Sequence, residues 1–205
     1  MIGRRIFDVG ASVTALAVLS PVLLLVAAAI RLDSPGPVFF RQERVGLNGR
    51  IFRIHKFRTM FHSVGGSGPA LTISGDARIT RVGAFLRRHK IDELAQLIDV
   101  ALGNMAFVGP RPELARYVAL YPEDVRRVVL SVRPGLTDVA SIEYRDEGSI
   151  LSASDDPETT YINVVMPAKL RLSAEYIKSR SFLGDMFVIA RTLAAIVAGA
   201  ATGNG

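Results

Sequence analysis

The sequence predicts an α+β fold in which an N-terminal membrane helix precedes a domain with a small β-hairpin and several helices. Three observations predict it. Residues 9–30 carry no charged side chain. Two short segments rich in Phe, Val and Ile flank an Asn-Gly pair, which is a signal for a hairpin. Most of the remaining chain has helical patterning interrupted by Pro and Gly. We therefore expect a membrane helix over residues 1–32 and a folded domain over residues 33–205.

The composition excludes several classes of protein. Hydrophobic residues make up 49% of the 205 residues and the mean hydropathy is +0.30, which is enough apolar material to exclude a disordered chain. The chain has no cysteine, so disulfide-stapled domains, Cys-based zinc sites and cysteine nucleophiles are excluded. Residues 31–135 carry 17 basic and 9 acidic side chains. This excess favours an anionic partner: nucleic acid, phospholipid headgroups or a polyphosphate.

The N-terminal apolar run has three interpretations. A cleaved signal peptide has a shorter apolar core, of about 7–15 residues. As a helix the run is about 33 Å long, which suits a spanning helix. Pro21, near its middle, cannot donate its N–H, and the Ser20 hydroxyl can bond a freed carbonyl and make a bend tolerable, which suits a re-entrant helix. Basic residues flank both ends and favour the cytoplasmic side for both: Arg4, Arg5, Arg31, Arg41 and Arg44. The spanning and re-entrant interpretations both stay open at this point.

The remaining elements follow from local signals. The Pro- and Gly-rich residues 33–37 are expected to end the membrane helix. Strands are expected over residues 38–45 and 50–57, joined at Asn48-Gly49, and a loop of small residues over 63–75. Helices are expected over residues 81–90, 92–102, 123–130, 158–165, 168–179 and 183–198. The last is apolar enough to lie on the bilayer surface, in the core or in a homodimer contact.

The adjacent carboxylates Asp92 and Glu93 carry the most informative chemistry. A structural interpretation is that Asp92 caps a helix and Glu93 complements its dipole. A functional interpretation explains more of the neighbouring sequence. Two carboxylates can share one Mg²⁺, which completes its coordination with water and phosphate oxygens. Arg87 and Arg88 supply planar donors for phosphate, and a free carboxylate can attack a diphosphate to form an acyl phosphate.

Two further arginines lie in loops stiffened by proline. Arg111 lies between Pro110 and Pro112, and Arg133 precedes Pro134. Either could be an ordinary loop residue, but together with Arg87 and Arg88 they favour a phosphate site. The chain has no P-loop motif and no G-x-S-x-G motif, and its three histidines lack the spacing of zinc ligands.

These segments, in their order, resemble the monotopic polyprenol-phosphate phosphoglycosyl transferases, the bacterial sugar transferase family. The resemblance covers residues 1 to about 140 and rests on the following matches: Ser20-Pro21, Ser34–Gly46, Lys56–Met60, Thr80–Gly83, Leu86–Arg88, Asp92–Leu94, Gly103–Met105, Val108–Pro112 and Val132–Thr137. Two departures are Ala95, where many relatives have proline, and Asp138-Val139, where many have Gly-Trp.

The resemblance implies that the protein transfers a phospho-sugar from a UDP-sugar to undecaprenyl phosphate and releases UMP, the first membrane step of bacterial glycoconjugate synthesis. Asp92 would be the nucleophile of a covalent phosphosugar intermediate, and Glu93 its partner in binding Mg²⁺. The membrane helix would be re-entrant and broken at Ser20-Pro21. The substrate site would then use further basic residues: Lys56, Arg58, Arg87, Arg88, Arg111, Arg133 and Arg145.

The same resemblance implies a catalytic domain with interfacial helices on the cytoplasmic face of the bacterial inner membrane, in contact with membrane lipid. Two other functions compete with the transferase. A membrane-anchored basic module would bind anionic lipid or nucleic acid without Mg²⁺, but aromatic side chains are not interleaved with the arginines, so nucleic acid is not expected. A lipid-diphosphate hydrolase would use the same carboxylates and release inorganic phosphate.

Overall fold

The computed structural model describes residues 2–62, 72 and 76–202. Its elements are, in order, α1 (Ile2–Asp33), β1 (Phe39–Val45), η1 (Leu47–Gly49), β2 (Ile51–Phe57), α2 (Arg81–Arg88), η2 (Ile91–Gln96), α3 (Leu97–Leu102), β3 (Ala106–Val108), α4 (Ala115–Val118), α5 (Glu123–Val129), β4 (Gly135–Thr137), α6 (Val139–Glu143), α7 (Glu147–Ser152), α8 (Pro157–Thr160), η3 (Tyr161–Val165), α9 (Met166–Lys178) and α10 (Phe182–Thr202). The predicted α+β fold with its long apolar N-terminal helix is confirmed. The predicted loop over residues 63–75 lies outside the described residues, apart from Thr72.

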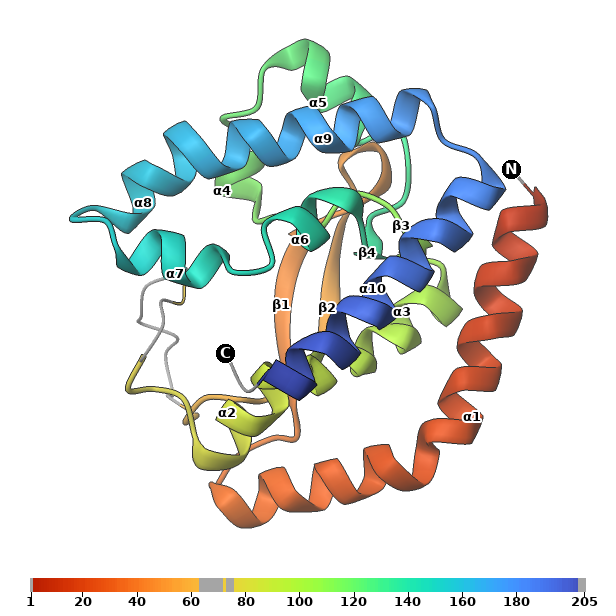
Figure 1. The fold of residues 1–205 in the computed structure, drawn as a ribbon. Helices are drawn as coiled ribbons and strands as arrows, with labels where there is room; N and C mark the ends of the chain where they lie inside the picture. The colour runs from red at the N-terminus through yellow and green to blue at the C-terminus, as the bar shows by residue number, and fades with distance from the viewer. Residues whose placement is uncertain (1, 63–71, 73–75, 203–205) are drawn as a thin grey trace.

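Helix α1 is one continuous helix with a proline inside it, and it ends at Asp33, where the breaker cluster predicts. Figure 1 shows it as two legs joined at a bend, one along the side of the molecule and one beneath it. Pro21 lacks the N–H that would bond the carbonyl of Ala17, and the Ser20 hydroxyl donates to that carbonyl at 2.8 Å. The predicted use of Ser20 is therefore confirmed. Within the described residues, Gly3–Asp33 is the one helical segment long and apolar enough to cross a membrane.

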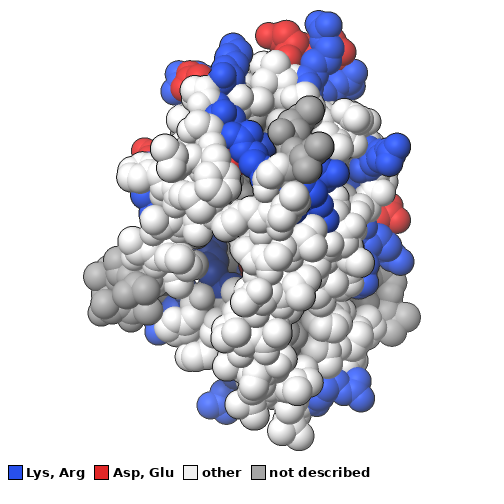
Figure 2. Space-filling view, turned by 90° about the vertical axis from the view of Figure 1, so that its right-hand side faces the viewer, with Lys and Arg blue, Asp and Glu red and all other residues white. Residues whose placement is uncertain are grey.

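Both ends of α1 contact the same folded unit. Near the N-terminus, the Arg5 guanidinium donates to the carbonyls of Val100 and Ala101, in the last turn of α3, at 2.8 and 3.0 Å. Near the C-terminus, Ile30 is buried in a cluster that includes Leu86 of α2. Large apolar side chains between the two ends are exposed: Val13, Val18, Val22, Leu24 and Leu25. Figure 2 shows a broad face without charged side chains, with Lys and Arg above it and at its lower edge.

The predicted hairpin is confirmed. Strands β1 and β2 pair antiparallel, from Phe39 opposite Phe57 to Val45 opposite Ile51. Asn48 and Gly49 have φ values of 55° and 78° in the short turn between the strands. This is the left-handed conformation for which the Asn-Gly pair is suited.

The sequence analysis missed a second, parallel pair of strands. Strands β3 and β4 have three residues each, too few for a periodic signal. The chain needs glycine where they continue into loops, because a Cβ on Gly109 would lie 2.3 Å from the carbonyl oxygen of Arg133. The loops that carry Arg111 and Arg133 therefore begin from one tight backbone contact.

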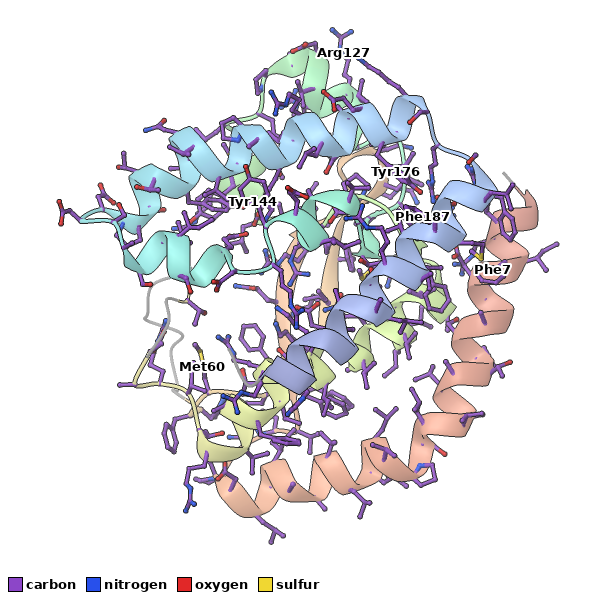
Figure 3. All side chains as sticks on the ribbon, in the orientation of Figure 1. Phe7, Met60, Arg127, Tyr144, Tyr176 and Phe187 are labelled. Carbon is purple, nitrogen blue, oxygen red and sulfur yellow. The ribbon has the colours of Figure 1, made fainter. Side chains whose placement is uncertain are left out.

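Two predicted helices differ from the structure. The predicted helix over residues 92–102 is a 3₁₀-helix, η2, followed by α3, and Asp92 lies inside η2 instead of capping it. The predicted helix over residues 158–165 is one turn of α8 followed by a π-helical turn, η3, which leads into α9. Helix α9 crosses the upper part of the molecule below α5 (Figure 1), and its Leu170 belongs to a core cluster with Tyr117 and Tyr161. Tyr144, labelled in Figure 3, packs against this cluster from the segment after α6.

Candidate active site

The backbone around Lys90 turns the two carboxylates into the fold. Thr80 caps α2 by accepting a hydrogen bond from the Gly83 N–H, and α2 ends at Arg88. Lys90 then adopts a left-handed conformation, with φ of 56°, which is uncommon for a residue other than glycine or asparagine. Helix η2 begins directly afterwards, and Asp92 is only 2% exposed. A buried carboxylate needs a charged partner, which strand β2 supplies.

Lys56 of β2 bridges the two carboxylates. Its Nζ lies 2.9 Å from Asp92 Oδ2 and 3.4 Å from Glu93 Oε1. The lysine is 36 positions before Asp92 in the chain, and the hairpin brings it there by packing β2 against η2. One ammonium group thus neutralises part of the charge of both acids.

Arg111 forms a two-pronged ion pair with Glu93. Its Nη2 donates to Glu93 Oε1 at 2.5 Å, and its Nη1 donates to Oε2 at 3.2 Å. Burial alone would raise the pKa of Glu93, but Arg111 and then Lys56 hold this pKa well below its usual value. The Glu93 charge in turn raises the pKa of Arg111. Glu93 is therefore an ionised carboxylate across the physiological pH range.

Arg87 is the third predicted basic residue near the acids. Its Nε donates to the hydroxyl of Thr59 at 2.9 Å, and its Nη2 to the hydroxyl of Thr72 at 3.4 Å. Burial lowers the pKa of Arg87, and the charge of Asp92 opposes that shift. Arg88 is exposed in the last turn of α2.

Lys90 belongs to this group and was missed by the sequence analysis. Lys90 is exposed; desolvation lowers its pKa, whereas the charges of Glu93 and Asp92 raise it. The available signal was a basic residue two positions before the Asp-Glu pair. Residues two positions apart on a regular helix do not face each other, and Lys90 has a left-handed backbone instead, so helical spacing could not place it in this group.

Three other predicted site residues are placed against backbone carbonyls. Arg58, 5% exposed, donates to the carbonyls of Ser34 at 2.8 Å and Ile30 at 3.3 Å, and also to that of Pro35. Arg133 Nε donates to the Gly103 carbonyl at 2.9 Å, at the end of α3 opposite to η2. Arg145 donates to the Ala195 carbonyl on α10. These positions favour a structural role for Arg58 and Arg133, which hold the ends of α1 and α3.

One structural observation at Asp92 fits a magnesium ion. Asp92 Oδ1 is buried and has no hydrogen-bond partner in the part of the chain that the structure describes. A buried, unpartnered carboxylate oxygen is a ready ligand for a hard cation. Among the described residues, no group of three or more His, Asp or Glu side chains could hold a metal ion. A site with one or two protein carboxylates suits Mg²⁺, which keeps water and substrate phosphate oxygens as its other ligands.

A small pocket adjoins the Arg111 side of this group. Its lining includes Val45, Gly46, Pro110, Arg111, Glu113 and Tyr121. Glu113 and Tyr121 were not singled out by the sequence analysis. Their signal was weak, because a glutamate and a tyrosine 8 residues apart match no motif with a known chemistry.

Comparison with known proteins gives consistent matches. The sequence model of a family described as bacterial sugar transferase matches residues 1–199. A UDP-glucose:undecaprenyl-phosphate glucose-1-phosphate transferase of Caulobacter vibrioides is 38% identical over 198 residues, which cover 95% of this chain and 69% of that protein. The exopolysaccharide production protein PSS of Rhizobium leguminosarum bv. phaseoli is 38% identical over 93% of this chain and 92% of that protein. A UDP-N-acetylgalactosamine-undecaprenyl-phosphate N-acetylgalactosaminephosphotransferase of Aeromonas hydrophila is 35% identical over 96% of this chain and 44% of that protein.

Proposed function

The chain belongs to the bacterial sugar transferase family, and on that premise we propose that it transfers a sugar 1-phosphate from a UDP-sugar to undecaprenyl phosphate and releases UMP. The names of the Caulobacter and Aeromonas relatives support this class of donor and acceptor. They give two different sugars, glucose and N-acetylgalactosamine, so the donor of this chain is a matter for direct measurement.

One observation carries the proposal: a buried aspartate and an adjacent glutamate share the cation Lys56, and Arg111 pairs with the glutamate. Asp92 keeps one buried oxygen, Oδ1, without a hydrogen-bond partner among the described residues. Phosphoryl transfer needs a nucleophile and positive charge around the transferring group, and this arrangement provides both.

In the proposed reaction a carboxylate oxygen of Asp92 attacks the phosphorus that bears the sugar. The bond from that phosphorus to the bridging oxygen of the diphosphate breaks, and UMP leaves with the bridging oxygen. Asp92 then carries the sugar phosphate as an acyl phosphate. A phosphate oxygen of the polyprenol phosphate attacks the same phosphorus, which frees the Asp92 carboxylate and forms the polyprenol diphosphate sugar.

The chain's own cations have separate tasks in this scheme. Lys56 pairs with Asp92 and orients its carboxylate, and Arg111 is held between two prolines with Glu93 as its partner. Arg87 is a further donor for the phosphate oxygens, since the charges of Asp92 and Glu93 both act on it. We propose that Asp92 and Glu93 hold Mg²⁺, which when bound would neutralise charge on the diphosphate and the leaving UMP.

The membrane geometry suits a lipid substrate. A straight helix crossing the hydrocarbon core would separate its two ends by about 30 Å of lipid. Both ends of α1 contact one folded unit through Arg5 and Ile30, which supports a hairpin that enters and leaves the bilayer on one side. We propose that this side is the cytoplasmic face of the inner membrane, because the basic residues flank both ends.

Intact-mass analysis of the purified full chain tests the reaction. The protein is mixed with Mg²⁺ and, in turn, with each UDP-sugar of a panel, without lipid acceptor. With one of the donors we expect the mass of the protein to increase by one phosphosugar. This added mass should disappear when polyprenol phosphate is added. Asp92→Asn should give no adduct, and the exposed Asp124→Asn should behave as the wild type.

Two results would overturn the proposal. An adduct that persists in Asp92→Asn would exclude Asp92 as the nucleophile. Release of inorganic phosphate from a lipid diphosphate, with no UMP from any UDP-sugar, would indicate a hydrolase.

A further inference from the structure

The carboxylate of Glu113, two residues after Arg111, is held by three donors from three parts of the chain. Arg44 Nη1 donates to Glu113 Oε1 at 3.0 Å, and the Leu114 N–H donates to the same oxygen at 2.7 Å. The Tyr161 hydroxyl donates to Oε2. The Glu113 side chain is 15% exposed. A carboxylate bonded in this way at both oxygens is fixed in position and direction.

Strand β1 also holds the backbone of this loop. The Val45 N–H donates to the Glu113 carbonyl at 2.9 Å, and Arg44 Nη1 lies 3.4 Å from the Pro112 carbonyl oxygen. At the other end of the loop, the Gly135 N–H donates to the Pro110 carbonyl at 2.9 Å. The backbone is thus held on both sides of Arg111, and on the C-terminal side it is held by β1 at Pro112 and Glu113.

Tyr161 links this loop to the C-terminal part of the chain. It is the first residue of the π-helical turn η3, and its ring packs on that of Tyr117 with centroids 5.0 Å apart. Irregular π-turns recur at functional sites because they redirect one side chain. Burial raises the pKa of Tyr161, and the charge of Glu113 raises it further. The hydroxyl therefore keeps its proton and remains a donor to Glu113 at any physiological pH.

We propose that Glu113 is a positioning residue for the transferase reaction: held by Arg44 and Tyr161, it fixes the loop on which Arg111 reaches Glu93. The inference rests on the proposed function and extends it to a group that makes no hydrogen bond or ion pair with Asp92 or Glu93 among the described residues. It gives the segment around η3 control over the active site, although no residue of that segment contacts Asp92 or Glu93 in the hydrogen bonds and ion pairs of the described residues.

Two single variants and one double variant test the proposal. Glu113→Gln keeps the size of the side chain and removes its charge, and Tyr161→Phe removes one hydroxyl. We expect each to lower kcat/KM for UMP release by about tenfold, the size of one lost charge-assisted hydrogen bond. In an Arg111→Ala background, Glu113→Gln should lower kcat/KM by less than about twofold more, because the residue that it positions is gone.

A second readout does not depend on activity. Arg111 is 38% exposed, so an arginine-specific dicarbonyl reagent can reach it, and its modification can be followed by peptide mass spectrometry. We expect severalfold faster modification of Arg111 in Glu113→Gln and in Tyr161→Phe. Tyr117→Phe is the matched control, because its hydroxyl bonds Arg116 and Glu158 and not Glu113. It should leave both readouts as in the wild type.

The results separate the inference from the proposed function. Wild-type protein without UMP release would contradict the proposed function, while the modification rates would still test the positioning. The inference would be overturned if Glu113→Gln and Tyr161→Phe both had the same Arg111 modification rate and the same kcat/KM as the wild type. A full tenfold loss from Glu113→Gln in the Arg111→Ala background would also overturn it, since Glu113 would then act independently of Arg111. If Glu113→Gln fails to fold, Tyr161→Phe carries the same test.

Discussion

The Ser20 hydroxyl donates a hydrogen bond to the carbonyl of Ala17 at 2.8 Å. Without it, this carbonyl would have no partner in a lipid environment, because Pro21 has no N–H to offer. An unpaired carbonyl in hydrocarbon costs several kcal/mol by order of magnitude, so the serine makes the bend tolerable at that place. The bend brings both ends of α1 back to the same folded unit, and this is the basis of the first prediction.

Both ends of α1 should be reached from one side of the membrane. The chain has no cysteine, so single cysteines can be labelled without background. Gly3→Cys and Leu32→Cys are suitable sites, because a side chain at residue 3 has open space around it and Leu32 is 89% exposed. We expect a membrane-impermeant maleimide to label both in inside-out vesicles and neither in intact cells. Labelling of the two sites from opposite sides would contradict the re-entrant arrangement.

Local signals were sufficient for the parts of the fold that depend on short-range geometry. Asn48-Gly49 predicted the hairpin because two left-handed residues are needed at its turn. The breaker cluster predicted the end of α1. The interpretation of Asp92 as a helix cap was wrong. Asp92 is buried against Lys56, which is distant in sequence, and that contact outweighs the preference of aspartate for a helix cap.

The candidate site was predictable as a list of residues but not as an arrangement. Lys56 and Arg58 are two positions apart, at the end of β2 and just after it. The structure places Lys56 on the acids and Arg58 on the carbonyls at the end of α1. A motif that contains both residues cannot separate these roles, because the difference depends on which distant elements, η2 or the end of α1, contact each side chain.

Replacement of Lys56 by methionine should impair catalysis and change its pH dependence. Lys56→Met keeps the length of the side chain and leaves Asp92 buried without its cation. We expect kcat/KM to fall by about 100-fold, as for the loss of one preorganised charge in other enzymes. Lys56 is also one of the groups that lower the pKa of Glu93, so the acid limb of the kcat profile should move to higher pH. The exposed Lys178→Met is the control, and an unmoved acid limb would show that Lys56 does not act on Glu93.

The ion pair between Arg111 and Glu93 should make stability depend on pH in a defined direction. The pKa of Glu93 is lower in the folded state than its unfolded value of about 4.5. Glu93 therefore contributes stability above pH 4.5, and this contribution is lost as the pH falls through the folded-state pKa. The Arg111 charge is the largest of the causes that lower the Glu93 pKa. Arg111→Gln removes it while burial remains, so the Glu93 pKa should rise. We expect this variant to be less stable than the wild type by about 2 kcal/mol at pH 7 and by a smaller amount at pH 4, where the Glu93 contribution has begun to fall. Equal differences in Tm at the two pH values, measured in detergent, would contradict this linkage.

Arg58 offers a test that separates structural support from substrate binding. Its guanidinium is buried and donates to the carbonyls of Ile30, Ser34 and Pro35, which are the last acceptors of α1 and the first residues after it. Lysine has one point charge in place of the planar fork and cannot bond all three carbonyls, so Arg58→Lys should lower the free energy of unfolding by about 2–3 kcal/mol. The KM for the UDP-sugar should stay within about twofold of the wild-type value, because the Arg58 guanidinium donates to three backbone carbonyls. A tenfold rise in KM with unchanged thermal stability would instead return Arg58 to the substrate site, as the family resemblance implies. The exposed Arg127→Lys on α5 provides a matched baseline for both measurements.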